Sequence, residues 1–428
     1  MPMTENIGVR VDLFKRTVMP APPTTVDDDG SYMYEKIAFC YIYPLDVTES
    51  SDGLCRMPIT SRTGKLVARI KAQYFIARPY AGSEPQQMIK TRLARGNSKA
   101  WQLKNGGLDI GHRGAGSARR TDRSEKVLEN TVDSFNYAFK KGADMVELDV
   151  QISKDKVPVV YHDFNVNIVL QKKDRNIETY PVNIKDLTFD QLQMLRTNPV
   201  RHDGDSKPAY EFDEDEGQQP HNQPFASFKS VLNHVEPQCG FNVEIKYPQK
   251  KINGQWEAEK SLDLNEYVDL VLQDLCNHAG DRNIIISSFH PELCSLVKLK
   301  QDRYPVLFLT QGLTKKWMQY ENPLNHSIEM ATYLALSTGL YGIAAHTEDI
   351  LRDRNLIRFV KSKGLILFVW GDDLNDREVI AGLKKEGVDG AIYDKIDLYV
   401  SKEDRLPQEG QHHEQHHEQQ QSVAMDVQ

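Results

Sequence analysis

Two pairs of charged residues have a spacing that suits chemistry on one face of a strand. Glu147 and Asp149 lie two apart in the run ADMVELDV (143–150), and Glu244 and Lys246 lie two apart in FNVEIK (241–246). Side chains alternate between the faces of a strand, so the two members of each pair project from the same face. An unpaired buried charge is costly, so two carboxylates on a buried strand need a cation, a proton or a ligand.

Histidines and fixed positive charges accompany these carboxylates. His112 and Arg113 follow the short run LDIG (108–111), and His162 ends VPVVYH (157–162). Three carboxylates without cysteine favour a hard cation, Mg²⁺ or Ca²⁺, over zinc. The two histidines suit an acid and a base. A single divalent cation with Arg113, Lys246 and two imidazoles describes a phosphate-ester site better than a sugar or carbonyl site.

Each of these residues also has a purely structural interpretation. Glu147 and Asp149 would then be a buried pair matched by Arg113 and Lys246, and His112 a hydrogen-bonded residue at the end of a strand. Trp370 ends the run LILFVW (365–370) and is interpreted first as a packing residue at a barrel rim. At that position its ring would alternatively offer a π-face to a quaternary ammonium group.

Strands and helices alternate after Gly107, which is typical of a parallel sheet. Eight parallel strands are expected, and eight match a (β/α)8 TIM-type barrel over residues 107–400, with catalytic groups at the C-terminal strand ends. The expected strands are 108–112, 145–149, 241–246, 284–288, 306–309, 342–346, 365–370 and 390–393. Helices are expected between them, among others at 132–141, 264–278 and 351–363.

One further strand, Val157–His162, follows Asp149 too closely for a parallel crossover, so the two form a hairpin that places His162 roughly opposite Asp149. Residues of about 150–225 are therefore expected to be an insertion after the second barrel strand. It contains this hairpin, a short helix near Phe189–Leu195 and an acidic loop that includes Asp213–Glu216. That loop is interpreted as solvated chain rather than an ion site.

The flanking segments carry no catalytic spacing. Residues 1–30 are expected to be a flexible lead-in, 31–80 a small antiparallel β module, and 81–106 a linker. Residues 401–428 are rich in His and Gln and are interpreted as low-complexity disorder rather than a metal-binding tail.

Composition limits the function classes. The 428 residues are 39% hydrophobic and 27% charged with a net charge of −8, which argues against a nucleic-acid partner. The five cysteines have no CxxC spacing, which favours free thiols in a reducing compartment. We expect no signal peptide and no membrane span, and therefore a cytoplasmic protein. Protein partners are not predictable.

Several motifs resemble the glycerophosphodiester phosphodiesterase family over about residues 107–400. They are GHRGAG (111–116), ENT (129–131), VELDVQISKDKVPVVYHD (146–163), NVEIK (242–246) and GVDGAIYD (387–394). Longer runs resemble its glycerophosphocholine-specific branch: LTFDQLQ (187–193), VLFLTQG (306–312), HTEDIL (346–351) and VWGDDLND (369–376). Upstream of residue 31 no starch-binding module of that branch is recognisable, and Trp370-Gly371 stands where many members have a WTVN-like run.

The resemblance implies a role for each matching residue. It assigns Glu147, Asp149 and Glu244 to the metal and His112 and His162 to acid–base catalysis. It assigns Arg113 and Lys246 to phosphate contacts and places Glu129 near the site. The implied reaction is metal-dependent hydrolysis of a small glycerophosphodiester, glycerophosphocholine, to glycerol 3-phosphate and choline. The alternatives are a lysophospholipase D acting on single-chain lipids, which requires an apolar rim beside the mouth, and a non-catalytic barrel that binds partners.

Overall fold

The structure is a computed structural model. It describes residues 9–18, 32–42, 52–81, 106–117, 127–171, 177–198, 209–212, 223–260 and 262–400. The chain divides into two compact units, Met1–Pro79 with Asp263–Asn265, and Tyr80–Leu262 with Glu266–Gln428. The linker predicted at 81–106, the acidic run 213–216 and the tail 401–428 lie almost wholly outside the described residues.

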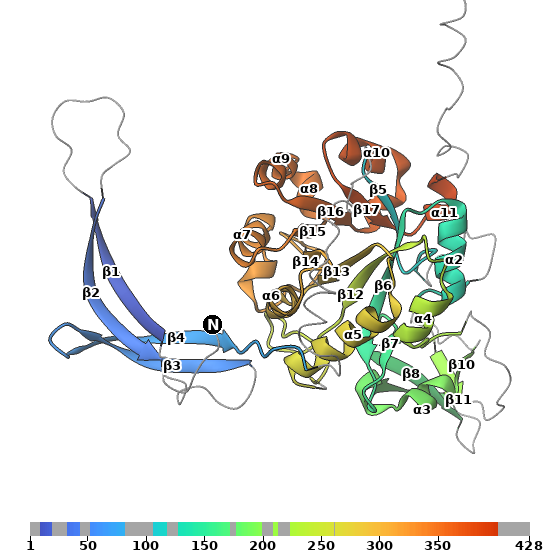
Figure 1. The fold of residues 1–428 in the computed structure, drawn as a ribbon, viewed down its shortest axis with the longest axis horizontal. Helices are drawn as coiled ribbons and strands as arrows, with labels where there is room; N and C mark the ends of the chain where they lie inside the picture. Colours follow the sequence, from blue (N-terminus) through green and yellow to red (C-terminus); the bar gives the residue numbers. More distant parts are fainter. Residues whose placement is uncertain are drawn as a thin grey trace, which may run out of the picture. The chain divides into compact units, whose positions relative to one another are not determined.

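The first unit is a four-stranded antiparallel sheet in the order β1-β2-β3-β4 (Figure 1). Its strands are β1 (Val9–Val18), β2 (Tyr32–Ile42), β3 (Asp52–Ser61) and β4 (Leu66–Phe75). The sheet therefore reaches into residues 1–30, and the prediction of a flexible lead-in is wrong for Val9–Val18. Valine and charged residues alternate at 9–12 with the period of a strand, and β1 pairs with β2 along its whole length.

The second unit is a closed barrel of eight parallel strands in the order β5-β6-β12-β13-β14-β15-β16-β17 (Figure 1). The TIM-type fold is confirmed. The strands are β5 (Leu108–Gly111), β6 (Met145–Ile152), β12 (Gly240–Ile245), β13 (Ile284–Ser288), β14 (Val306–Thr310), β15 (Gly342–His346), β16 (Ile366–Trp370) and β17 (Gly390–Tyr393). Aliphatic and aromatic side chains fill the interior, among them Ile110, Met145, Ile285, Leu307 and Phe368.

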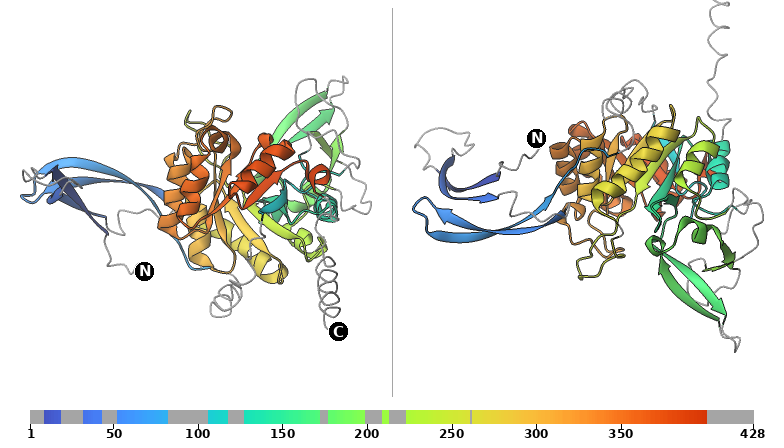
Figure 2. Two further views of the ribbon diagram at one scale, coloured as in Figure 1. Left: turned by 90° about the horizontal axis from the view of Figure 1, so that it is seen from above. Right: turned by 60° about the horizontal axis from the view of Figure 1, so that its bottom comes forward.

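Helices surround this barrel (Figure 2). They are α2 (Val132–Lys141), α4 (Phe228–His234), α5 (Leu264–His278), α6 (Pro291–Lys300), α7 (Ile328–Thr338), α8 (Thr347–Arg352), α9 (Asn355–Ser362), α10 (Arg377–Lys385) and α11 (Ile396–Tyr399). Capping residues set their limits: Thr131 accepts a hydrogen bond from the Ser134 backbone N–H, and Gly142 ends α2 in the left-handed region. The single helix expected at 351–363 is two helices, because Asp353 leaves the helical conformation and its side chain accepts from the Asn355 N–H.

The insertion begins with the expected hairpin. Strand β7 (Pro158–Val160) pairs antiparallel with β6, and Lys156 takes a positive φ of 67° in the turn. In this register Tyr161 lies opposite Asp149, and its N–H donates to the Asp149 carbonyl at 3.0 Å. His162 is the next residue, so it is held within one position of the predicted register.

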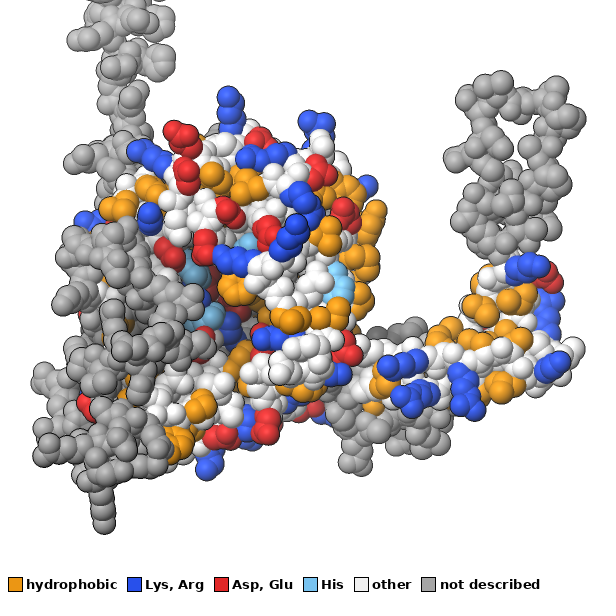
Figure 3. All heavy atoms as spheres, turned by 180° about the vertical axis from the view of Figure 1, so that it is seen from behind, with side chains coloured by type: hydrophobic (Ala, Val, Ile, Leu, Met, Phe, Trp, Pro, Cys, Tyr) orange, Lys and Arg blue, Asp and Glu red, His pale blue; other side chains and the backbone are white. Residues whose placement is uncertain are grey.

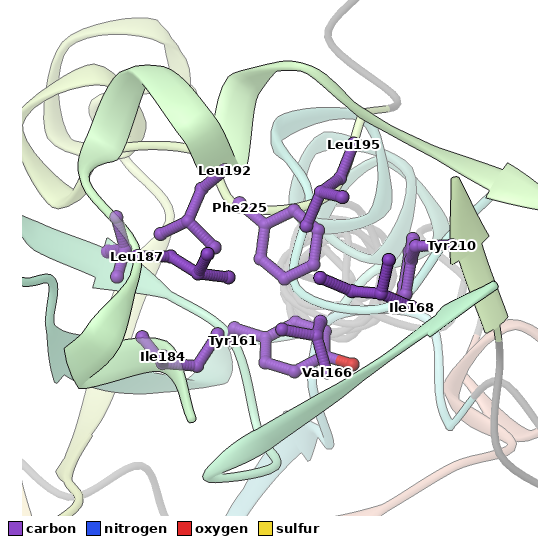
Figure 4. Packing of buried hydrophobic residues seen from close by; sticks show 10 residues of the cluster. Tyr161, Val166, Ile168, Ile184, Leu187, Leu192, Leu195, Tyr210 and Phe225 are labelled. Atoms are coloured by element: carbon purple, nitrogen blue, oxygen red, sulfur yellow. The ribbon is translucent and has the colours of Figure 1, made fainter. Parts of the chain in front are cut away.

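A second four-stranded sheet in the insertion was not expected from the sequence. It has the order β10-β11-β8-β9 and packs with helix α3 (Phe189–Gln193). Its strands are β8 (Asn165–Gln171), β9 (Ile177–Asn183), β10 (Leu195–Asn198) and β11 (Ala209–Phe212). Tyr161, Phe225 and Tyr210 meet at the centre of its core, with ring centroids of Tyr161 and Phe225 4.5 Å apart (Figure 4).

Candidate active site

Three carboxylates meet on the neighbouring strands β6 and β12. The two strands are neighbours in parallel register, with Glu244 beside Asp149 and Asn242 beside Glu147. Ligand oxygens of Glu147, Asp149 and Glu244 all lie within 4.8 Å of one another. Glu147 is 4% and Asp149 1% exposed. The sequence spacing therefore predicted a real cluster, which can hold a metal ion.

Two cationic side chains border the cluster. The Lys246 ammonium lies 3.1 Å from Glu244 and 3.5 Å from Asp149. The Arg113 guanidinium reaches Asp149 at 3.8 Å and donates to Glu129 at 2.8 Å. Glu129 is thus linked to the cluster through Arg113. The ion pairs expected from a purely structural role are therefore present. Arg113 and Lys246 nevertheless carry only two positive charges, and four carboxyl groups share them.

The turn after β5 brings Arg113 over the cluster. Arg113 itself has a φ of 51°, and its backbone N–H donates to Glu147 at 2.7 Å. Gly114 has a φ of 90°, and a Cβ there would lie 2.4 Å from the Ser134 hydroxyl. Glycine is required because any side chain would push the turn away from α2. The backbone conformation of the GHRGAG run (111–116) therefore places His112 and Arg113 beside the carboxylates.

Each histidine is paired with an aspartate through Nδ1. His112 Nδ1 lies 2.7 Å from Asp394, which follows β17, and His162 Nδ1 lies 2.8 Å from Asp163. The Gln151 amide donates to the carbonyls of Tyr161 and Asp163, on both sides of His162. Nε2 of neither histidine has a hydrogen-bond partner among the described residues, so these two atoms are the ones available to a substrate.

Burial and charge separate the pKa values of these groups. Burial, followed by the neighbouring Asp149, raises the pKa of Glu147 to about 8. Burial opposes ionisation of Asp149 as well, but His162, Lys246 and Arg113 together lower its pKa. Burial, Arg113 and Lys246 lower the pKa of His162 to about 4. Burial and Arg113 also lower the pKa of His112, but Asp394 outweighs them, so the pKa of His112 is raised.

The donor set fits a hard divalent cation. Oδ1 of Asp149, both polar side-chain atoms of Asn242 and Oγ of Ser287 are buried without a hydrogen-bond partner among the described residues. Asn242 lies beside Glu147 and Ser287 beside Glu244 in the strand register. Buried polar atoms normally have partners, so this end of the barrel is suited to a ligand that supplies them. Carboxylate and amide oxygens are what Mg²⁺ and Ca²⁺ prefer.

Trp370 lies at the end of β16, against the interior cluster of the barrel. Its indole N–H donates to the Ala344 carbonyl at 3.2 Å, and its ring meets those of His346 and Phe289 edge-on at 4.6 and 5.4 Å. Trp370 therefore packs against the barrel interior, as expected, while part of its ring remains exposed to solvent. On the face seen in Figure 3, histidine side chains lie in a hollow with acidic and basic side chains around them.

Three residues of the site were missed by the sequence reasoning. They are Asp394, which holds His112, Asn130, whose amide donates to Asp149 at 2.9 Å, and Asn242. Asp394 follows a barrel strand directly and Asn242 is two residues before Glu244, so strand position was an available signal for both. Asn130 lies inside the ENT motif (129–131) and Asp394 ends the GVDGAIYD motif (387–394), so the family resemblance was a second signal. The φ of 57° at Asn130 is visible only in the structure.

Comparison with known proteins agrees with this geometry. Residues 112–398 match the Glycerophosphoryl diester phosphodiesterase family. The chain belongs to this family.

Similar curated proteins are named glycerophosphocholine phosphodiesterases. The Homo sapiens protein is 38% identical over 351 residues, which cover 81% of this chain and 51% of that protein. A putative Caenorhabditis elegans homologue is 34% identical over 85% of this chain and 54% of its own. The chain thus spans about half the length of these relatives. A solved glycerophosphodiester phosphodiesterase of Thermotoga maritima is 25% identical over 68% of this chain and 96% of its own, with a TM-score of 0.44.

Proposed function

We propose that this chain hydrolyses glycerophosphodiesters with a divalent cation, and that glycerophosphocholine is its substrate, giving glycerol 3-phosphate and choline. One observation carries the proposal: three clustered carboxylates, two histidines paired to aspartates, and Arg113 with Lys246 converge at one end of the barrel. Membership of the family supports the reaction, and the names of the similar proteins support the substrate.

Glu147, Asp149 and Glu244 would hold the cation, Mg²⁺ or Ca²⁺. When bound, it supplies Lewis-acid stabilisation of the negative charge that develops on the phosphate. Lys246 and Arg113 contribute fixed positive charge to the same phosphate, and both stay protonated because the surrounding carboxylates raise their pKa values despite burial. Glu129 keeps the Arg113 guanidinium oriented.

The histidines move protons at Nε2. One takes the proton of the nucleophile, a water or the glycerol hydroxyl, and the other protonates the leaving alkoxide. Asp394 and Asp163 bind Nδ1–H and so fix the ring orientation and tautomer of His112 and His162. Their environments differ, since Asp394 raises the pKa of His112 whereas burial lowers that of His162, and this difference suits an acid and a base.

The substrate's trimethylammonium group has charge but no N–H donor, so an aromatic face suits it. We assign this contact to Trp370. We also propose a cytoplasmic location, supported by the cysteines: Cys40, Cys55, Cys239 and Cys294 are buried free thiols. No helix in the described part of the chain is long and apolar enough to cross a membrane.

Single-chain glycerophospholipids are a second candidate substrate class. One observation favours them: large apolar side chains are exposed on loops at the C-terminal end of the barrel, among them Trp256 and Trp317. The alternative of a non-catalytic barrel is disfavoured, because every group that the reaction needs is present at hydrogen-bond or ion-pair distance from another.

The test is choline release from glycerophosphocholine by the purified chain, with lysophosphatidylcholine as a parallel substrate. Activity is expected with Mg²⁺ or Ca²⁺ and is expected to vanish in excess EDTA. Glu244→Gln should be inactive. Asp269→Asn is the matched control and should stay active. It changes a largely buried acid of α5, which pairs with Lys300 of α6. Full activity in EDTA, or in Glu244→Gln, contradicts the proposal.

A further inference from the structure

Two loops at the C-terminal end of the barrel are joined into one surface. Residues 248–260 follow β12, and residues 311–321 follow β14. The Ile252 N–H donates to the Gln319 carbonyl at 2.9 Å, and the Glu321 N–H donates to the Lys250 carbonyl at 2.7 Å. We call these two segments together the loop rim. Backbone hydrogen bonds make the loop rim a defined surface rather than two separate loops.

The loop rim exposes large apolar side chains. Its five such residues are 45–58% exposed: Ile252, Trp256, Leu313, Trp317 and Met318. Single exposed apolar residues are ordinary on a protein surface, but several on one joined pair of loops mark an interaction site.

Lysines lie among these apolar residues. The loop rim contains five lysines, at 250, 251, 260, 315 and 316, against three glutamates, at 257, 259 and 321, and so has a net charge of +2 in a chain of net −8. Lys250 pairs with Glu321 at 3.0 Å, and Lys316 contacts Asp372. Lys251 and Lys315 have no ion pair among the described residues. Glu257 is turned inward, where it accepts from the Tyr320 hydroxyl.

The loop rim is continuous with the mouth of the site. The Trp317 indole N–H points to the His346 ring nitrogen at 3.4 Å, and the ring of His346 lies 4.6 Å from that of Trp370. Tyr320 lies 5.9 Å from Phe289, which in turn meets Trp370 at 5.4 Å. Aromatic contacts therefore lead from the exposed loops to the barrel interior.

We propose that the loop rim docks the chain onto an anionic phospholipid surface, with the mouth of the barrel facing the lipid. Tryptophan prefers the boundary between headgroups and acyl chains. Lysines beside apolar side chains that insert into the lipid add attraction to anionic headgroups. A second copy of the chain fits less well, because two loop rims of net positive charge repel each other. Docking through the loop rim does not depend on the reaction.

The test is flotation of the full chain with vesicles of phosphatidylcholine alone or with about 30 mol% phosphatidylserine, which gives the vesicles an anionic surface. Binding is expected only with phosphatidylserine and should weaken as salt is raised. Ile252→Ser/Met318→Ser should lower the vesicle partition coefficient on the order of tenfold or more, because two half-exposed side chains lose their insertion. Lys251→Gln/Lys315→Gln should lower it by several-fold and reduce its salt dependence.

The matched control is Tyr333→Ser/Leu336→Ser, which changes two similarly exposed apolar residues on α7 and should leave binding unchanged. Hydrolysis of soluble glycerophosphocholine by Ile252→Ser/Met318→Ser should stay at the level of the unmodified chain, so loss of docking and loss of the reaction are separately measured. Absence of vesicle binding, equal binding by the loop-rim variants, or concentration-dependent self-association that those variants abolish would each overturn the proposal.

Discussion

Nδ1 of His112, at the end of the first barrel strand, lies 2.7 Å from Oδ1 of Asp394, at the end of the last. Strands β5 and β17 are neighbours, and the His112 N–H donates to the Tyr393 carbonyl at 3.0 Å. Closure of the barrel thus brings together two residues 282 positions apart. The backbone N–H of Ser117 also donates to Asp394. Burial opposes ionisation of Asp394, but His112 and then Ser117 hold the pKa of its carboxyl well below the usual range.

The first prediction concerns Asp394→Asn. Asp394 raises the pKa of His112 against the effects of burial and Arg113, so its removal should move the His112 limb of the rate–pH profile to lower pH. We expect kcat to fall by about 10- to 10²-fold, less than the ~10²–10⁴ of removing the imidazole itself. Asp163→Asn is the control, since it should change the His162 limb. An unchanged profile in Asp394→Asn would assign Asp394 a purely structural role.

The same pair should make stability pH-dependent. The pKa of His112 is raised, so its contribution is complete below the pKa of the unfolded chain and is lost as pH rises through the folded value. The pKa of Asp394 is lowered, so its contribution is present above the ordinary carboxyl range and is lost as pH falls. Asp394→Asn should therefore lower Tm most in the mildly acidic range between these limits, measured by thermal melts across pH. A uniform loss of Tm at every pH would show that the pair does not titrate as described.

The histidines themselves give a direct prediction. His112→Ala and His162→Ala should each lose about 10²–10⁴ in kcat, because each removes one proton-transfer group. Circular dichroism should show intact folds, since both side chains are partly exposed. A variant that keeps near-normal kcat would show that its histidine is not a catalytic residue.

Metal binding should stabilise the protein more at high pH. Burial and Asp149 raise the pKa of Glu147 to about 8, so at pH 6 this carboxyl holds a proton that the cation must displace. Added Mg²⁺ or Ca²⁺ should raise Tm more at pH 8 than at pH 6. At a hundredfold excess over Kd the cation should add about 2.7 kcal/mol to the free energy of unfolding. Glu244→Gln should abolish this shift, and Asp269→Asn should retain it. An equal shift in Glu244→Gln would place the cation elsewhere.

Trp370→Leu separates the two roles of this side chain. Loss of a cation–π contact should raise KM for glycerophosphocholine by about 2- to 30-fold, corresponding to ~0.5–2 kcal/mol, with little change for glycerophosphoethanolamine or glycerophosphoinositol. If Trp370 acts only through its contacts with Phe289 and His346, all three substrates should be affected alike and Tm should fall. Steady-state kinetics on the three esters, with melting curves, distinguish these outcomes.

Much of the barrel was predictable, because each strand is a short apolar run and Glu147, Asp149, Glu244 and Lys246 occupy alternate positions on such runs. The β8–β11 sheet was not, because its strands pair out of sequence order, with β11 parallel to β8. Strand β1 was missed because its partner lies beyond a long separating segment. Asp394 and Asn130 lie inside family motifs, but their pairing with His112 and Asp149 was not predictable, because it depends on barrel closure and on the positive φ of Asn130.

The hairpin between β6 and β7 has a consequence for how activity is acquired during folding. The eight barrel strands close without the insertion, but Tyr161 belongs to the core of the insertion and His162 is the next residue. The base of the insertion is tied at Val160, whose N–H donates to the Ala226 carbonyl at 2.8 Å. Contacts between residues far apart in the sequence form late, and barrel closure joins His112 and Asp394 across 282 positions. On refolding, the helical signal should therefore return before activity does, because activity requires both this closure and the packing of Tyr161, which places His162, into the core of the insertion.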